Sequence, residues 1–319
     1  MARIGLTSSM PLVPRHCAPS LCVRPVGRTV IVASAFLLAS CKIQDDASFR
    51  RANADRLPVA TASSARVEPE GGDGTIPEGP MGASIRRGRA LMLATRDSLP
   101  RQVGNALRCV SCHLDEGRRP FAMPWTGVVA RYPQYRARSG TVELVEDRVN
   151  ECFRRSLAGR PLPVDGTAMR DIVAYLTHLS RGVPVGTRVT GQGVDSVKAA
   201  ARGDTATGRA VYVAQCARCH GATGEGTPLA PPAWGAKSFT IGAGMARWRV
   251  AAAFIRHNMP NDRRESLSEQ EAIDVAGYLD SRPRPDFRGK ERDWPNGKAP
   301  DDAAYKTTGP KAAVRARRS

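Results

Sequence analysis

Two five-residue stretches of one pattern decide the fold of this chain: Cys109-Val110-Ser111-Cys112-His113 and Cys216-Ala217-Arg218-Cys219-His220. In such a Cys-x-x-Cys-His pattern two thiols attach a c-type haem, and the histidine is the proximal iron ligand. The alternatives are structural zinc, which needs further Cys or His pairs close by, and a redox dithiol, which needs a βαβ pattern; the sequence has neither. We therefore expect two covalently bound haem c groups, attached through Cys109, Cys112, Cys216 and Cys219 and ligated by His113 and His220.

The residues around the two motifs repeat one plan. Each motif follows a Gly-Arg-Ala run, at 88–90 and 208–210, and precedes an apolar run of helical period, at 172–176 and 275–279. A helix, a haem motif and a closing helix are the parts of a class I-like cytochrome c domain. The expected fold is therefore mainly α, with two such domains in tandem. Such small domains bury little apolar surface, and aromatic residues make up only 5% of the chain, so the haem is expected to complete each core.

Composition sets the expected boundaries along the chain. The stretch before the folded part is rich in Ala, Asp, Glu, Gly and Pro, which is typical of a flexible tether, and the glycine- and proline-rich stretch after residue 182 is typical of a linker. We expect a signal peptide at 1–41, a tether at 42–80, cytochrome c domain 1 at 81–185, a linker at 186–202, cytochrome c domain 2 at 203–283, and an extended or disordered C-terminal segment at 284–319.

The N-terminal region indicates export from the cytoplasm. A region with four arginines and no acidic residue precedes the apolar run 30–39, which is too short to span a bilayer and fits the core of a signal peptide. The run ends in Leu38-Ala39-Ser40-Cys41, which resembles a lipoprotein cleavage box in which Cys41 receives lipid. The alternative is an ordinary secretory signal that happens to contain Cys41. We expect a periplasmic protein that is anchored to a membrane through lipid on Cys41.

The chain is strongly basic, with a formal net charge of +18. Removal of the four signal-peptide arginines leaves +14. We expect no nucleic-acid partner for an exported haem protein. The positive field would instead attract anionic small molecules or an acidic redox partner, although a role in solubility alone is an equal alternative.

The candidate for the sixth iron ligand differs between the two domains. Met259, in an Asn-Met-Pro stretch ahead of the last helix, follows His220 by 39 residues, and methionine is a common second ligand of electron-transfer haems. The residue 39 positions after His113 is Cys152. Cys17 and Cys22 leave with the predicted signal peptide, Cys41 takes lipid and four cysteines take haem, so Cys152 is the cysteine left over. An unpaired thiol is unusual in an exported protein. The spacing therefore favours Cys152 over Met169, which we interpret as a packing residue; an inert buried thiol is the remaining alternative.

A thiolate on haem iron donates electron density to the metal, and a thiolate is also a good nucleophile toward sulfur. Arg148 lies four residues before Cys152 and Ser156 four residues after it, so all three can share one helical face. Arg154, Arg155 and the run 135–140, which contains Arg138, add further positive charge. Arginine forks bind oxyanions, so the pattern favours a small sulfur oxyanion as the ligand. The alternative is that these arginines are surface charges or pair with haem propionates.

Six stretches resemble the dihaem thiosulfate dehydrogenase family: GNALRCVSCHL at 104–114, PQYRARS at 133–139, DRVNECFRRS at 147–156, SRGVPV at 180–185, FTIGAGM at 239–245 and PRPDF at 283–287. The resemblance covers about residues 80 to 305. It implies that two thiosulfates are joined to tetrathionate with release of two electrons, a reaction that some members run in reverse. It also implies His113 and Cys152 as ligands of the catalytic haem, Arg138, Arg148 and Ser156 as substrate-site residues, and His220 and Met259 as ligands of the second haem.

This chain differs from some members of the family at the residue before the methionine ligand. Some members carry a lysine before the methionine ligand, which binds iron in the oxidised state, whereas this chain has Asn258. We therefore expect His/Met ligation of the second haem in both redox states.

The sequence thus predicts an enzyme in which electrons pass from the first haem to the second and on to an external acceptor, such as a small cytochrome c. Two alternatives remain: a non-catalytic dihaem electron carrier, and a haem subunit of a sulfur-oxidising complex.

Overall fold

The computed structural model describes residues 75–199 and 201–309. The chain divides into two units, 1–62 and 63–319, and every described residue belongs to the second unit. The predicted signal peptide with Cys41, most of the tether and the last ten residues lie outside the described part. No helix within that part is both long enough and apolar enough to cross a membrane.

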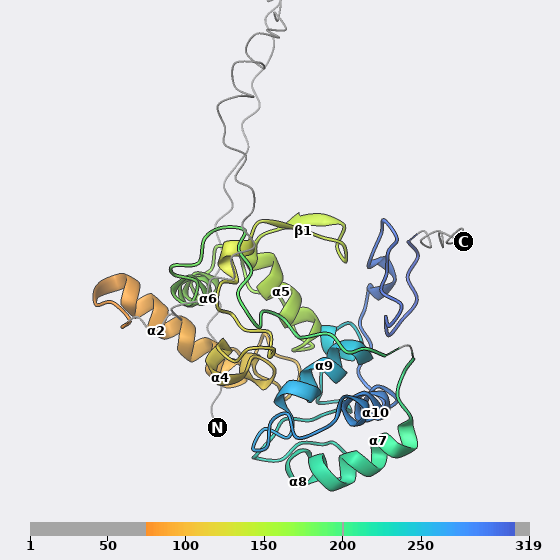
Figure 1. The fold of residues 1–319 in the computed structure, drawn as a ribbon. Helices are drawn as coiled ribbons and strands as arrows, with labels where there is room; N and C mark the ends of the chain where they lie inside the picture. The colour runs from red at the N-terminus through yellow and green to blue at the C-terminus, as the bar shows by residue number, and fades with distance from the viewer. Residues whose placement is uncertain (1–74, 200, 310–319) are drawn as a thin grey trace, which may run out of the picture. The chain divides into compact units, whose positions relative to one another are not determined.

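The first haem domain is helical with one small hairpin (Figure 1). A long helix opens it and a second long helix closes it, with the haem motif, the hairpin and a shorter helix between them. The elements are α2 (Gly79–Leu93), α3 (Thr95–Ser98), η1 (Cys109–Ser111), α4 (Leu114–Gly117), η2 (Val129–Arg131), β1 (Gln134–Arg136), β2 (Thr141–Glu143), α5 (Val145–Arg155) and α6 (Thr167–His178).

The second haem domain repeats this order without a hairpin. Its elements are α7 (Thr205–Val211), the π-helical turn η3 (Tyr212–Cys216), α8 (Ala217–His220), η4 (Gly244–Ala246), α9 (Trp248–Asn258) and α10 (Glu269–Asp280), and the single turn η5 (Lys290–Arg292) follows. Ser268 and Glu271 form a capping box at the start of α10, where each side chain accepts from the other residue's backbone N–H. The prediction of a mainly α fold with two tandem cytochrome c domains is confirmed.

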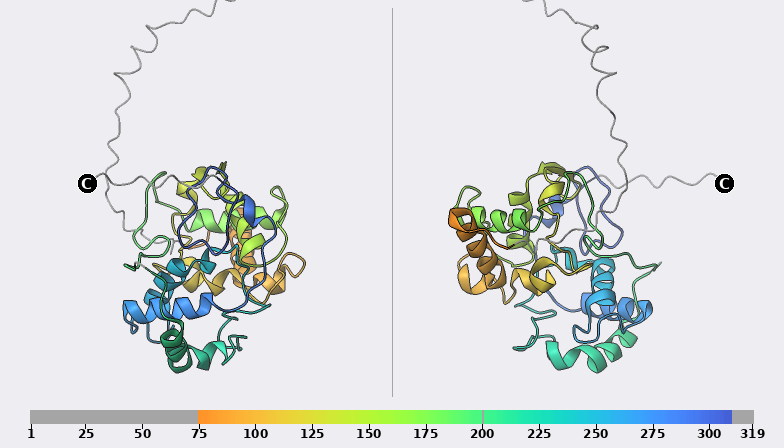
Figure 2. Two further views of the ribbon diagram at one scale, coloured as in Figure 1. Left: turned by 90° about the vertical axis from the view of Figure 1, so that its right-hand side faces the viewer. Right: turned by 60° about the vertical axis from the view of Figure 1, so that its left-hand side comes forward.

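Each domain is held together by a crossing of its first and last helices. Helix α2 packs against α6, and α7 packs against α10 (Figures 1 and 2). Each crossing has a glycine of the Gly-Arg-Ala run at its centre. A Cβ at Gly88 would lie 1.9 Å from the carbonyl oxygen of Asp171, and one at Gly208 would lie 2.0 Å from that of Asp274. Only glycine admits so close an approach of two backbones, which explains why both repeats carry it.

Two separate hydrophobic cores follow from the two crossings. The first surrounds Tyr175 and Phe153, and the second surrounds Tyr212 and Tyr278. Met169 is fully buried in the first core, which fits the packing role that the spacing argument gave it.

The C-terminal segment differs in part from its prediction. Residues 284–309 are extended apart from η5, but they pack against both domains: Asp293 pairs with Arg155 of the first and Asp302 with Arg247 of the second. Asp293 and Trp294 are only 5% and 4% exposed. Composition alone suggested a tail because this segment is rich in charge and proline. Its partners are distant in sequence, and Arg155, which pairs with Asp293, lies 138 positions earlier. The linker is also held against the first domain, because the backbone N–H groups of Phe121 and Met123 donate to the carbonyls of Gly191 and Gly193.

Candidate functional site

The first haem motif begins in η1 and ends at a half-buried histidine. His113 Nδ1 lies 2.6 Å from the carbonyl oxygen of Met123. A carbonyl only accepts, so Nδ1 carries the proton and Nε2 is left to bind iron. Burial lowers the pKa of His113 to about 4, which keeps the ring neutral, as a metal ligand must be. The indole of Trp125, 5.1 Å from the imidazole between ring centroids, restrains the ring further.

The second haem motif repeats this arrangement. His220 Nδ1 lies 2.8 Å from the carbonyl oxygen of Pro231, and burial lowers its pKa. Cys216, Cys219 and His220 line one largely apolar cavity of about 490 Å³, and Met259 lines it too. A cavity of this size is in the range that holds a large cofactor. The structure therefore brings together all four residues that the sequence assigned to the second haem.

Arg284 supports the fit of this cavity to haem. Its guanidinium lines the cavity, donates to the carbonyls of Ala233 and Leu279, and stacks over Phe239 at 4.0 Å, but Nε is buried without a hydrogen-bond partner in the described residues. Burial lowers its pKa to about 10. A buried cation without a carboxylate fits an anionic group such as the haem carboxylates. The donor set, the cavity and this cation together fit haem c.

The two haem motifs also adjoin one another. The wall of the second cavity includes Leu107, Val110 and Cys112 from the first domain. One of the attachment cysteines of the first haem thus borders the space of the second. This proximity suits electron transfer between the two cofactors.

Met259 and Cys152 occupy related but different positions. Met259 is the C-cap of α9, whereas Cys152 lies inside α5, four residues before the C-cap Ser156. Asn258 is fully buried and donates to the carbonyls of Phe254 and Phe121. The count of 39 residues therefore led to the corresponding helix in each domain, though not to the same turn of it.

Cys152 lies beside the first haem motif. Burial is the main cause that raises the pKa of Cys109 and Cys112 to about 12, and the electrostatic effect of the nearby Cys152 thiol adds to it in both. Cys152 also raises the pKa of Arg148 against the opposing effect of burial. Ser156 donates its backbone N–H to the carbonyl of Cys152 at 2.9 Å. Arg148 and Cys152 thus lie in α5, and Ser156 is its C-cap.

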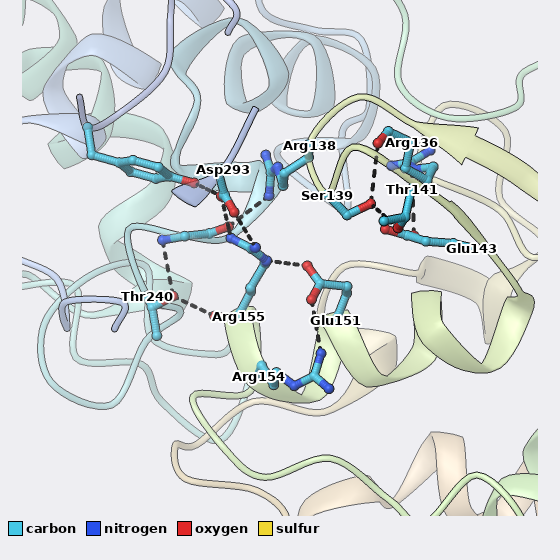
Figure 3. A network of polar contacts seen from close by, with 12 residues as sticks. Arg136, Arg138, Ser139, Thr141, Glu143, Glu151, Arg154, Arg155, Thr240 and Asp293 are labelled. Carbon is cyan, nitrogen blue, oxygen red and sulfur yellow. Dashed lines mark hydrogen bonds and ion pairs between the residues drawn. The ribbon is translucent and has the colours of Figure 1, made fainter. Parts of the chain in front are cut away.

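Arg138 lies in the turn between β1 and β2, and its side chain points toward Arg155 and Asp293 (Figure 3). Its Nη1 donates to the carbonyl of Gly242 at 2.9 Å, and its guanidinium stacks on the ring of Trp294 at 4.9 Å. Burial lowers the pKa of Arg138, and the neighbouring charges of Arg155 and Arg148 lower it further. Arg138 and Arg148 are therefore close enough to repel each other, and neither has an ion pair with a carboxylate among the described residues.

The two arginines that flank Cys152 have different surroundings. Arg155 is buried and forms ion pairs with both Asp293 and Glu151. Arg154 is exposed and pairs with the other side of Glu151, as Figure 3 shows. Their charges are therefore already compensated, whereas Arg138 and Arg148 form no ion pair with a carboxylate among the described residues.

Sequence reasoning missed Arg131. Its Nε is buried without a hydrogen-bond partner in the described part of the chain. Burial lowers the pKa of Arg131, and the charges of Arg136, Arg188 and Arg148 lower it further. Its position two residues before the 133–139 stretch was the only available signal. Arg131 extends the positive field around Arg148.

Comparisons with known proteins agree with this geometry. The family model of the SoxA/TsdA cytochrome c domain matches residues 101–185, and that of cytochrome c oxidase, cbb3-type, subunit III matches residues 203–279. The thiosulfate dehydrogenase of Psychrobacter arcticus is 42% identical over 236 residues, which cover 72% of each chain. That of Allochromatium vinosum is 45% identical over 67% of this chain and 83% of its own. This chain belongs to the thiosulfate dehydrogenase family.

A solved structure of the same family has the same fold. The thiosulfate dehydrogenase TsdBA of Marichromatium purpuratum, in its as-isolated form, matches with a TM-score of 0.62 and 37% identity. The match covers 65% of this chain and 47% of that one, so this chain spans about half of the solved chain. As a thiosulfate dehydrogenase family member with two cytochrome c domains, the chain is an oxidoreductase that carries two covalently bound haem c groups.

Proposed function

We propose that this enzyme oxidises thiosulfate and couples two thiosulfate ions to tetrathionate. The two electrons pass from the first haem to the second and then to an external acceptor, such as a small cytochrome c. The names of its relatives support the substrate. The observation that carries the choice of site is the position of Cys152: it lies near enough to Cys109, Cys112 and Arg148 to affect their pKa values, and Arg148 has no carboxylate partner in the described residues.

This proposal assigns two iron ligands to each haem. His113 and Cys152 would ligate the first iron, and His220 and Met259 the second. Bound haem supplies one-electron redox couples, which a pair of thiols or a zinc ion would not. The thiolate at the first haem would favour a lower potential than the methionine at the second, which suits electron flow in this direction.

Arg138 and Arg148 bind the substrate anions in this proposal. Thiosulfate carries two negative charges, and guanidinium forks donate paired hydrogen bonds to such oxyanions. Ser156, one turn after Cys152, adds a hydroxyl donor. Because the two arginines are half-buried, their attraction for an anion is stronger than at an exposed surface.

Cys152 performs the sulfur chemistry. Its thiolate bonds to the sulfane sulfur of a first thiosulfate, and two electrons leave one at a time for the acceptor. A second thiosulfate then attacks that sulfane sulfur and breaks its bond to Cys152. The products are tetrathionate and the regenerated thiolate, so two thiosulfates give one tetrathionate and two electrons.

The experiment that tests this function mixes the purified holoprotein with thiosulfate and ferricyanide and assays for tetrathionate. We expect one tetrathionate for every two ferricyanide ions reduced. A plain electron carrier would exchange electrons with added reductants but form no tetrathionate. A haem subunit of a larger complex would be inactive until its partner was added. Either result would contradict the proposal.

The place of this reaction is part of the proposal. Haem attachment and the apolar run at 30–39 support export to the periplasm, and Cys41 supports attachment to a membrane by lipid. Both stay predictions, because residues 1–74 lie outside the described part.

A further inference from the structure

The C-terminal segment reaches back to the two elements that carry the substrate-site residues. We propose that residues 287–305, here called the C-terminal clasp, position Arg138 for the substrate anion, and that Trp294 is the positioning residue. This inference rests on the proposed function. It assigns a role to a segment that the sequence indicated only as an extended or disordered tail.

One side of the clasp holds the hairpin that carries Arg138. The backbone N–H of Trp294 donates to the carbonyl of Arg138 at 2.7 Å, and the Trp294 ring lies under the Arg138 guanidinium. Asn296 Nδ2 donates to the Tyr135 hydroxyl at 3.2 Å. A Cβ at Gly140 would lie 2.6 Å from Pro295 Cγ, so the turn of the hairpin needs glycine to accept the clasp.

The other side of the clasp holds α5. Both carboxylate oxygens of Asp293 accept hydrogen bonds from Arg155, from Nη1 and Nη2, at 2.7 Å each. The Tyr305 hydroxyl donates to the same carboxylate, and the Arg155 guanidinium lies over the ring of Phe287 at 4.3 Å. The side chains of Arg155 and Asp293 are 9% and 7% exposed, so this is a buried ion pair. Figure 3 shows Arg138, Arg155 and Asp293 gathered at this point.

The kind of contact that the clasp makes differs between the two arginines, and the difference has a physical consequence. Asp293 neutralises Arg155, which removes a positive charge that would compete for the anion. Trp294 holds Arg138 through its ring face, which orients a guanidinium without adding a negative charge. Arg138 is therefore fixed in place and keeps its full charge for the substrate.

The backbone of Trp294 is itself constrained. Its φ of 54° lies in the left-handed region, which is unfavourable for a large side chain, yet the residue is 4% exposed. Such a conformation persists only where the surroundings hold it, and it is often found at functional sites. Here it aims the indole at Arg138.

The test compares Trp294→Leu with Trp294→Phe in the holoprotein, using thiosulfate and ferricyanide. Loss of the ring face should raise KM for thiosulfate about three- to tenfold and change kcat less than about twofold, whereas phenylalanine should restore most of the affinity. Trp248→Leu is the matched control, because Trp248 is also buried and stacks under Arg249 at 4.3 Å, but in the second domain. It should leave KM unchanged.

A double-variant cycle separates positioning from general loss of packing. If Trp294 acts through Arg138, Trp294→Leu should add little to the loss already caused by Arg138→Gln. Hydrogen exchange of residues 134–143 should also rise in Trp294→Leu and not in Trp248→Leu. A full additional loss of affinity in the Arg138→Gln background, or equal KM values for the leucine and phenylalanine variants, would overturn the role of the clasp in an active enzyme. Absence of tetrathionate with the wild type would instead overturn the proposed function before any variant is compared.

Discussion

Arg148 and Arg154 lie on the same helix on either side of Cys152, yet their surroundings differ. Arg148 lies close to Cys152 and has no carboxylate ion pair in the described residues. Arg154 is exposed and pairs with Glu151. Arg148 and Arg154 therefore have different roles in the proposed function: Arg148 binds the substrate anion, whereas Arg154 contributes a screened surface charge.

This contrast predicts the effect of two identical substitutions. Arg148→Gln should lower kcat/KM for thiosulfate about ten- to a hundredfold, because it removes a charge-assisted hydrogen bond of roughly 1.5–3 kcal/mol. Arg154→Gln should change it less than about twofold. Steady-state kinetics of both holoproteins provide the measurement, and equal losses would show that Arg148 does not face the substrate.

Much of the site at this scale could be predicted from the sequence, because its key residues are close together in the chain. Arg148, Cys152 and Ser156 follow from helical spacing, and the haem attachments from their motif. Asp293 and Trp294 could not be found in this way. Their partners lie 138 and 156 positions earlier, and no local pattern records such a contact.

At the scale of elements, the two domains share one frame and differ in one helix. The crossings at Gly88 and Gly208 are the same, and the Gly-Arg-Ala runs predicted both. The candidate iron ligand Cys152 lies within helix α5, whereas Met259 is the C-cap of α9. The sequence could predict the frame because helical periodicity is local. It could not predict the packing of residues 284–309, because a charged, proline-rich stretch has no period that reveals a partner.

The packing of residues 284–309 should contribute to the free energy of unfolding. Asp293→Asn should lower the free energy of unfolding by about 3 kcal/mol or more, because it leaves Arg155 buried with one partner fewer. Asp262→Asn is the matched control: it breaks the Arg218–Asp262 pair, whose side chains are 49% and 55% exposed, and should cost less than about 1 kcal/mol. Denaturant unfolding of the holoproteins measures both. Similar costs would mean that the C-terminal clasp adds little stability.

At the scale of the whole molecule, two domains of similar fold surround their haem motifs with different residues, and in the proposed function they have different roles. The first brings a thiol and uncompensated arginines to its haem motif, and the second surrounds its motif with an apolar cavity that Met259 lines. Cys112 and Val110 border that cavity, which joins the two sites. The internal repeat was evident in the sequence. The contact between the two haem sites was not, because it depends on how separate segments pack.

The central claim is that sulfur chemistry takes place at Cys152 and that the second haem only relays electrons. The most direct test measures thiosulfate-dependent tetrathionate formation by Cys152→Gly holoprotein beside the wild type. We predict a loss on the order of a hundredfold or more, while ascorbate still reduces the second haem at the wild-type rate. Full thiosulfate turnover by Cys152→Gly would contradict the account.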